Sequence, residues 1–255
     1  MKSVDFGKTA SDYGKHRAGF PQEFFWELVR HGIGTPGQRI VDLGTGTGTI
    51  ARQLALSGCK VTGIDVSESM LAQAKRLDGE AGACVHYFTG EAENTGLEGQ
   101  SYDVVTAGQC WHWFDKSRAA AEAFRILRAG GRLVIAHFDW LPLAGSVVEA
   151  TEQLILKHSP QWQLSGGVGI HSRFMPGLSE TGFRDIRTFS FDTDALYSHE
   201  AWLGRVRASA GIGPVLSESK VREFDNEHRF VLASRFPGEP LRAPHRVWAV
   251  IAHRP

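Results

Sequence analysis

An alternation of glycine and threonine, with glycines at Gly44, Gly46 and Gly48, is the first feature of the sequence that could serve chemistry. Glycine adopts backbone conformations closed to other residues, and it lacks the Cβ atom that would collide with a ligand. The run follows the apolar segment RIVDL and precedes a helical pattern, so it lies where a loop leaving a parallel strand can approach a nucleotide. Two carboxylates accompany it: Asp42 precedes the loop, and Asp65 ends the next apolar segment, VTGID.

Nicotinamide dinucleotides and S-adenosylmethionine both use such a loop, and two positions favour the second. The dinucleotide pattern needs a third glycine where Thr49 stands. Asp42 would be an awkward neighbour for a pyrophosphate, whereas it suits a ligand that carries an ammonium and a sulfonium group. Asp65 can accept hydrogen bonds from both ribose hydroxyls, which indicates a nucleoside in either case. The loop therefore predicts a positively charged nucleoside ligand.

The elements that must position these residues predict an α/β fold. From Arg39 onward, short apolar runs alternate with helical patterns, which is typical of βαβ crossovers and a parallel sheet. We expect five strands in this order, a helix over DKSRAAAEAFRILRAGG that ends at Gly130 and Gly131, and a last strand at HRVWAVIAH. The predicted architecture is a Rossmann-like doubly wound sheet, mostly parallel with an antiparallel last strand, plus an inserted lid after the fifth strand.

Residues 37–140 resemble the class I S-adenosylmethionine-dependent methyltransferases, within the type 11 branch that acts mostly on small molecules. The resemblance rests on five segments in the order and spacing of that family's motifs: VDLGTGTGTIARQLA, VTGIDVSESML, FTGEAENTGL, YDVVTAGQCWHWFD and RILRAGGRLVIAHFDW. It implies a Rossmann-like enzyme with S-adenosylmethionine as cofactor and S-adenosylhomocysteine as product.

The resemblance implies where the methionine end of the cofactor would lie. Gly44, Thr45 and Gly46 would line it, and Asp42 would be near its amino group. Gln109, which leaves the fourth predicted strand, would flank the same end.

The resemblance also implies contacts with the nucleoside end of the cofactor. Asp65 would hold the ribose, while Val66 and Met70 would pack against the adenine. The backbone amide of Ala92 and a carboxylate of its neighbours would bind the adenine edge; the two candidates are Glu91 and Glu93.

The segment DYGKHRAGFP resembles the N-terminal element with which this branch closes over its cofactor, so Tyr13 and Arg17 are candidate contacts. We accordingly expect a single methyltransferase domain over residues 1–255. Its parts would be an N-terminal cofactor-covering element (1–38), a cofactor-binding core (39–140), an inserted substrate lid (141–181), and C-terminal strands and helices (182–255).

The stretch CWHWFD, directly after the fourth predicted strand, could contact the methyl acceptor. Aromatic faces near a sulfonium offer cation–π attraction, and Trp111 and Trp113 would also shape an apolar pocket. Packing in the core is the alternative for Phe114 and for one of the two tryptophans. His112 could act as a general base, because a neutral imidazole is available near pH 7.

The fifth predicted strand sends His137, Asp139 and Trp140 toward the same rim, and we expect substrate contacts from His137 and Trp140. The insertion that follows is helical near VVEATEQLILKH and otherwise irregular. Some of its side chains could face the acceptor as a lid, although a surface role is equally compatible with the sequence; they are His158, Trp162, His171 and Arg173.

The composition excludes several other classes. The 28 basic and 28 acidic residues balance, so we expect neither nucleic acid nor a membrane surface as partner. Three cysteines without CxxC spacing argue against disulfides and zinc, and the histidines show no ligand spacing, so we expect no metal. We find no export signal and no membrane helix, which favours the cytoplasm. The sequence does not indicate an oligomeric state.

These observations predict transfer of a methyl group from S-adenosylmethionine to a small organic acceptor by in-line displacement. The bound methyl group is already activated, so no obligatory catalytic residue is required. Two alternatives stay open at this point: an NAD(P)-dependent oxidoreductase on the same sheet, and a cofactor-binding regulatory module without turnover.

Overall fold

A computed structural model describes residues 19–209 and 211–255 of the chain. These residues form two compact units. The larger unit contains residues 19–138, 171–190 and 247–255, and the smaller unit contains residues 139–170 and 191–246. The predicted contacts of Tyr13 and Arg17 lie outside the described residues, and the predicted division of the chain into four segments stays a prediction.

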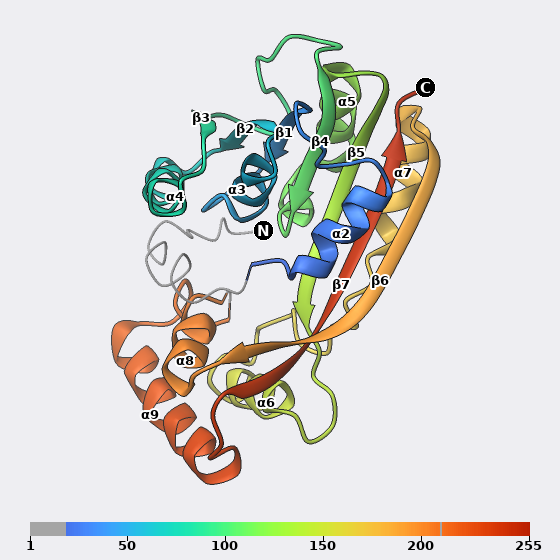
Figure 1. The fold of residues 1–255 in the computed structure, drawn as a ribbon. Helices are drawn as coiled ribbons and strands as arrows, with labels where there is room; N and C mark the ends of the chain where they lie inside the picture. The colour runs from blue at the N-terminus through green and yellow to red at the C-terminus, as the bar shows by residue number, and fades with distance from the viewer. Residues whose placement is uncertain (1–18, 210) are drawn as a thin grey trace. The chain divides into compact units, whose positions relative to one another are not determined.

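Seven strands form one sheet in the order β3-β2-β1-β4-β5-β7-β6. The first five pair in parallel, and the arrow of β7 in Figure 1 runs opposite to that of β5. The sheet predicted from the sequence, mostly parallel with an antiparallel last strand, is thereby confirmed. The strands are β1 (Arg39–Leu43), β2 (Lys60–Asp65), β3 (Val85–Thr89), β4 (Tyr102–Gly108), β5 (Leu127–Trp140), β6 (Arg184–Tyr197) and β7 (Leu241–His253).

The central strands of the larger unit are apolar because helices cover both faces of a parallel sheet. In β1 only Arg39 is exposed, and Ile40, Val41 and Leu43 have no accessible surface. The helices of this unit are α2 (Gln22–Arg30), α3 (Thr49–Leu56), α4 (Glu68–Ala81), α5 (Lys116–Ile126) and α7 (Met175–Thr181), with 3₁₀ turns η2 (Trp111–Trp113) and η3 (Ser172–Phe174).

Local capping explains where the helices next to the loop begin. Gly48 precedes α3 in a left-handed conformation, and the Ser67 hydroxyl accepts the amide of Met70 at the start of α4. The predicted end of α5 is wrong. The helix ends at Ile126, and β5 already includes residues 127–131, where the side chain of Leu127 is fully buried. Burial of that side chain in the sheet outweighs the helix-ending signal of the two glycines.

The smaller unit packs three helices with the adjoining ends of β5, β6 and β7. They are α6 (Val147–His158), α8 (His199–Arg207) and α9 (Glu218–Arg235), and α9 contacts both of the others. Its interior includes a polar group: the Thr151 hydroxyl donates to the Val147 carbonyl at 2.7 Å and accepts the Trp202 indole N–H at 3.0 Å. His228 Nε2 lies 3.3 Å from the same hydroxyl. Because the threonine proton is already used, the Nε2 atom must carry its own proton and donate it.

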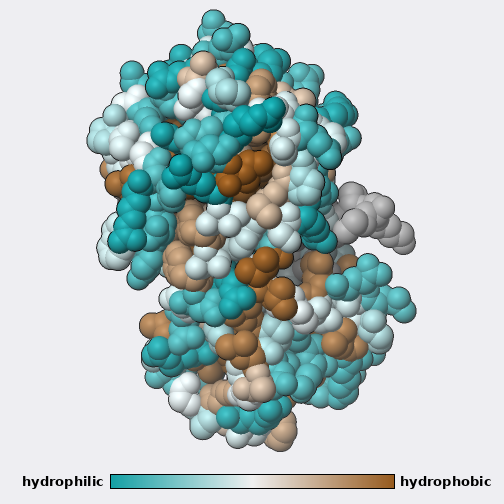
Figure 2. Space-filling model, turned by 90° about the vertical axis from the view of Figure 1, so that its right-hand side faces the viewer, coloured by the Kyte–Doolittle hydropathy of each residue, from teal (hydrophilic) through white to brown (hydrophobic). Residues whose placement is uncertain are grey.

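Hydrophilic residues cover most of the face drawn in Figure 2, with apolar residues among them. The smaller unit exposes several large apolar side chains, including Leu196 (60%) and Phe230 (72%). Exposed residues of this kind are normal on protein surfaces and carry no site by themselves. Among the described residues, no helix has both the length and the apolar character needed to cross a membrane.

Candidate functional site

The glycine loop follows β1 in the larger unit, and its three glycines have positive φ values. Gly44, Gly46 and Gly48 have φ angles of 59°, 55° and 77°, which residues with a Cβ rarely adopt. Neighbouring side chains also leave no space for a Cβ atom at Gly44. A Cβ atom there would lie 2.9 Å from both the Cβ of Cys110 and the Cζ of Phe114. The loop is therefore drawn against the segment that follows β4, which brings both segments to one end of the sheet.

Asp42 lies at the base of this loop and is almost fully buried, with 2% of its surface exposed. Each carboxylate oxygen accepts a hydroxyl: Thr45 donates at 2.7 Å and Thr106 of β4 donates at 2.6 Å. Burial raises the pKa of Asp42 to about 6, and these hydrogen bonds and the nearby negative charge of Asp65 act as smaller influences in opposite directions. In this arrangement Asp42 orients the loop. Its predicted contact with the cofactor's amino group stays a prediction.

Asp65 ends β2 beside the loop, as expected for a residue that binds a nucleoside. One carboxylate oxygen accepts the backbone amide of Gly46 at 2.8 Å, and the other accepts the amide of Ser67 at 2.9 Å. The next residue, Val66, is 69% exposed, and Met70 lies buried in the first turn of α4. An exposed valine beside a fixed carboxylate fits the predicted pairing of an apolar adenine contact with a ribose acceptor.

The segment predicted at the adenine edge follows β3. Ala92 is buried in the core of the unit. The carboxylate of Glu93 accepts the backbone amide of Asp115, which caps the start of α5, at 2.7 Å. Glu91 is exposed and forms an isolated bridge with Asn94. Because the Glu93 carboxylate already accepts a hydrogen bond at the start of α5, Glu91 is the better candidate for a contact with the adenine edge.

Gln109 leaves β4 in a strained conformation, with a φ of 62°. Its backbone amide donates to the Ala136 carbonyl at 2.8 Å, and its side-chain amide donates to the Phe138 carbonyl. Non-glycine residues with positive φ cluster at functional sites, where the surrounding structure holds them in place. Gln109 is thus fixed at the end of the strand, where the resemblance predicts a contact with the methionine portion.

The CWHWFD segment divides into a buried and an exposed part. Trp111 is 1% exposed and packs edge-on against Phe114 in the core, whereas Trp113 is 38% exposed. The position of Trp111 supports a packing role instead of the substrate contact predicted for it. Among the two tryptophans, Trp113 is therefore the candidate for an acceptor contact.

Three histidine rings follow one another in the larger unit. The ring centroids of His112 and His137 lie 5.5 Å apart, and His137 stacks on His171 at 3.8 Å. The structure thus brings together the candidate base, a candidate from β5 and one of the candidates from the insertion. His137 is 2% exposed, so its predicted contact with the acceptor stays a prediction.

Trp140 belongs to the smaller unit, where both its indole N–H and its ring face already contact neighbouring residues. The indole N–H donates to Glu152 at 2.8 Å, and the guanidinium of Arg205 lies 4.9 Å from the ring centroid. Glu152 also accepts the backbone amide of Gly166 at 2.8 Å, and burial raises the pKa of this carboxyl. The substrate contact predicted for Trp140 stays a prediction.

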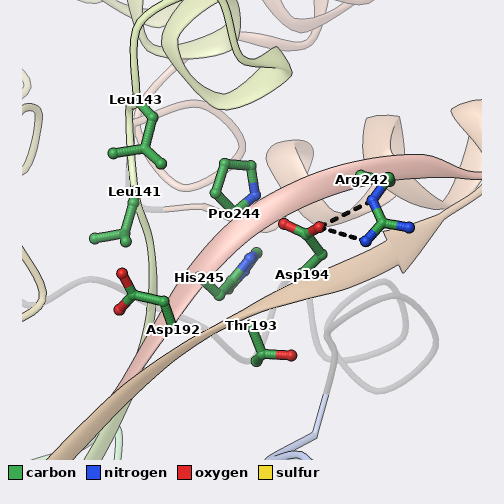
Figure 3. A pocket seen from close by; sticks show the side chains of 8 residues that line it. All are labelled: Leu141, Leu143, Asp192, Thr193, Asp194, Arg242, Pro244 and His245. Atoms are coloured by element: carbon green, nitrogen blue, oxygen red, sulfur yellow. Dashed lines mark hydrogen bonds and ion pairs between the residues drawn. The ribbon is translucent and has the colours of Figure 1, made fainter.

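The smaller unit also holds an open pocket of about 380 Å³. Its carboxylates face guanidinium groups: Asp194 pairs with Arg242 at 2.9 Å, and Asp192 forms a two-pronged pair with Arg246 at 2.6 and 2.8 Å. We interpret this wall as a row of mutually neutralised ion pairs, and we assign it no ligand. Figure 3 shows the residues that line it: Leu141, Leu143, Asp192, Thr193, Asp194, Arg242, Pro244 and His245.

The structure adds site residues that the sequence analysis missed. Thr106 is fully buried in β4 and binds Asp42, 64 residues earlier in the chain. The one polar side chain within the apolar run VVTAG was the available signal, since a buried polar group needs a partner. Arg52 binds the carbonyl of Thr47 within the loop, and nothing in the local sequence marks that contact.

Residues 41–135 match a family described as "Methyltransferase domain". The match contains the glycine loop, Asp65, Gln109 and the CWHWFD segment, which together form the site described above. Residues 41–135 belong to this family of methyltransferase domains. The resemblance inferred from the motifs is confirmed by this match.

Relatives of the methyltransferase domain include two curated bacterial proteins. An uncharacterized methyltransferase of Mycobacterium tuberculosis is 34% identical over 132 residues, which cover 51% of this chain and 51% of the relative. A ubiquinone biosynthesis O-methyltransferase of Pseudomonas syringae is 31% identical over 131 residues, which cover 51% of this chain and 56% of the relative. The chain thus spans about half the length of the curated relatives that it matches.

Solved structures share the fold over nearly the whole chain. The YcgJ protein of Bacillus subtilis has a TM-score of 0.59 at 17% identity and covers 92% of this chain and 100% of its own. Phosphoethanolamine N-methyltransferase 2 of Haemonchus contortus, crystallised with S-adenosylmethionine, has a TM-score of 0.57 at 22% identity and covers 98% and 56%. At these identities the likeness shows the fold, and the methyltransferase domain carries the family assignment.

Proposed function

We propose that the protein transfers the methyl group of S-adenosylmethionine to a small organic acceptor by in-line displacement. The observation that carries this proposal is the carboxylate of Asp65, which the structure holds at the end of β2 directly beside the glycine loop. That pairing lies within the methyltransferase domain. It supplies an acceptor for ribose hydroxyls and a backbone surface without side chains for the rest of the ligand.

The residues present fit S-adenosylmethionine. Gly44, Thr45 and Gly46 would line its methionine portion, and Asp65 would accept the ribose hydroxyls. The exposed side chain of Val66 would gain a partner in the adenine ring. In the same arrangement Met70, Glu91, Ala92 and Gln109 would complete the cofactor site, with Asp42 and Glu93 holding its supporting segments. The crystal of the Haemonchus contortus neighbour with S-adenosylmethionine supports this choice of cofactor.

When bound, S-adenosylmethionine supplies a methyl group that is activated by its sulfonium charge. The protein then needs to align the acceptor and keep water away, and alignment alone can remove up to about 7–11 kcal/mol of a barrier in ideal cases. Trp113 would offer an aromatic face and His137 a ring edge to the acceptor. His112, 5.5 Å from His137 between ring centroids, would take a proton from an acceptor that must lose one.

The acceptor class is a small organic molecule. One relative is named for an O-methylation and one structural neighbour for an N-methylation, so the shared domain serves more than one kind of acceptor atom. The balanced charge of the chain offers no general attraction for nucleic acid or for an anionic membrane surface. We propose that the protein acts in the cytoplasm on a metabolite.

A labelled-methyl screen tests the proposal. The protein is incubated with S-adenosylmethionine carrying a heavy methyl group and with a library of small metabolites, and products are identified by mass. The proposal expects one acceptor class to gain the label at a rate that depends on enzyme concentration. Binding of S-adenosylhomocysteine without transfer to any acceptor would instead indicate a regulatory module, and binding of NAD(P) in its place would indicate an oxidoreductase.

A further inference from the structure

Three side chains, the buried Asp78 and the half-buried Arg52 and Tyr87, hold the glycine loop from the side that faces α4 and β3. Arg52 of α3 donates through Nη2 to the carbonyl oxygen of Thr47 at 2.7 Å and, less closely, to that of Ala74 in α4 at 3.3 Å. Its Nε lies 2.6 Å from Oδ1 of Asp78, and the two side chains are 12% and 6% exposed. Arg52 thereby connects the loop to α4 through two of its nitrogen atoms.

Tyr87 of β3 completes this group. A Cβ atom on Gly48 would lie 2.3 Å from the tyrosine oxygen, and one on Gly63 would lie 2.6 Å from its ring. The ring therefore fills the space that these two glycines leave. Burial, and then the neighbouring carboxylate of Asp78, raise the pKa of Tyr87 above its ordinary value, so the hydroxyl keeps its proton. We call Arg52, Asp78 and Tyr87 the loop brace.

The three side chains of the loop brace hold one another by charge and packing, while Arg52 Nη2 supplies the hydrogen bonds to the loop and to α4. Among the described residues, no well-aligned hydrogen bond reaches Arg52 Nε, either oxygen of Asp78 or the hydroxyl of Tyr87, although Nε and the carboxylate are in ion-pair contact. A buried ion pair repays its desolvation only with excellent geometry, so its net contribution to stability is small. The guanidinium of Arg52, held by Asp78, fixes the position of the Thr47 carbonyl.

We propose that Arg52, backed by Asp78, is a positioning residue for cofactor binding. Gly46 is held from one direction by Asp65, and the next residue, Thr47, is held from another by Arg52. Held at these two adjacent residues, the loop keeps its shape before the cofactor arrives, so binding does not have to order it. This inference rests on the proposed function, because it concerns affinity for S-adenosylmethionine and its product.

A charge-free double variant separates positioning from stability. Arg52→Met with Asp78→Leu removes both charges, so no unpaired charge stays buried, and the melting temperature is expected to remain near that of the wild type. The Thr47 carbonyl loses its charged donor, and the Kd for S-adenosylhomocysteine is expected to rise about tenfold by calorimetry. If Arg52 and Asp78 served stability alone, both the melting temperature and the Kd for S-adenosylhomocysteine of this variant would equal those of the wild type.

Arg52→Lys keeps the inference testable if the double variant does not fold. Lysine retains a positive charge near Asp78, but its single ammonium group cannot replace the fork that serves both Asp78 and Thr47. A rise in Kd of several-fold with an unchanged melting temperature is expected. Unchanged affinity in this variant would overturn the inference.

The matched control is the part-buried ion pair between Arg207 and Asp225, whose closest atoms are 2.7 Å apart. Arg207→Met with Asp225→Leu should leave the Kd for S-adenosylhomocysteine unchanged. If this control loses as much affinity as the Arg52 variants, the effect is general and the proposed positioning role is wrong. A wild-type protein that does not bind S-adenosylhomocysteine would contradict the proposed function itself, whereas normal wild-type binding with insensitive Arg52 variants would contradict only the role of the loop brace.

Discussion

The carboxylate of Asp65 accepts the backbone amide of Gly46 at 2.8 Å, across 19 residues of sequence. This bond joins the end of β2 to the loop that leaves β1, so one side chain both shapes the loop and presents acceptor oxygens beside it. We propose that the remaining lone pairs of the carboxylate receive ribose hydroxyls. On this proposal, loop geometry and nucleoside recognition would depend on the same residue.

Replacing this carboxylate should weaken binding of the whole nucleoside. We expect Asp65→Ala to cost about 1.5–3 kcal/mol in affinity, or about ten- to a hundredfold in Kd, because charge-assisted hydrogen bonds are lost. Adenosine and S-adenosylhomocysteine should both lose affinity in calorimetric titrations. Glu80→Ala, which removes an exposed carboxylate of α4, is the control. Unchanged affinity of Asp65→Ala would remove Asp65 from the site.

Substitution of the two tryptophans of the CWHWFD segment should affect different properties: Trp111 should matter for stability and Trp113 for recognition of the acceptor. Trp111 is 1% exposed, so Trp111→Ala is expected to lower the free energy of unfolding by about 3–5 kcal/mol in urea denaturation. Trp113 is 38% exposed, so Trp113→Ala should cost about 1 kcal/mol or less and act mainly on the KM for the acceptor. Equal losses of stability in the two variants would contradict the assignment.

Local sequence patterns predicted the parallel sheet and the glycine loop because both depend on neighbouring residues. Gly44, Gly46 and Gly48 indicate a left-handed loop wherever the chain goes next. The sequence could not predict that Trp111 is buried and Trp113 is not. The two residues are of the same type within one short turn, and they differ only in which distant side chains pack against them. The distant partners of Asp42 and Arg52, which are Thr106 and Asp78, were equally hidden, since each depends on which strand or helix the fold places alongside.

Asp42 should make stability fall as the pH rises. Its pKa of about 6 in the folded protein lies above the ordinary 3.8, so the folded state binds the proton more tightly. The resulting stabilisation is complete below about pH 4 and is lost as the pH passes about 6, with an upper limit of about 3 kcal/mol. Asp42→Asn does not titrate, so its stability relative to the wild type should improve between pH 4 and pH 7. A constant difference in urea denaturation would show that Asp42 titrates normally.

His228 should have the opposite effect in an overlapping pH range. It has no exposed surface, and burial lowers its pKa from 6.5 to about 4, with Arg207 and Arg229 adding smaller effects. The folded state therefore disfavours the proton, and stability that is present above about pH 6.5 is lost as the pH falls through about 4. His228→Gln should be less sensitive to acid by up to about 3 kcal/mol over this range.

Because Asp42 and His228 act in opposite directions between about pH 4 and 6, the wild-type profile alone does not reveal either group. Each effect is read from the difference between the wild type and its own variant, measured at several pH values. If the double variant Asp42→Asn with His228→Gln shows the same pH profile as the wild type while each single variant also matches it, both assignments are wrong.

The most direct test of the whole account is a calorimetric titration of the wild-type protein with S-adenosylhomocysteine and, separately, with NAD⁺ and NADP⁺. We predict saturable one-to-one binding of S-adenosylhomocysteine and no heat of binding for either dinucleotide. Saturable binding of NAD⁺ or NADP⁺ with none for S-adenosylhomocysteine would contradict the account.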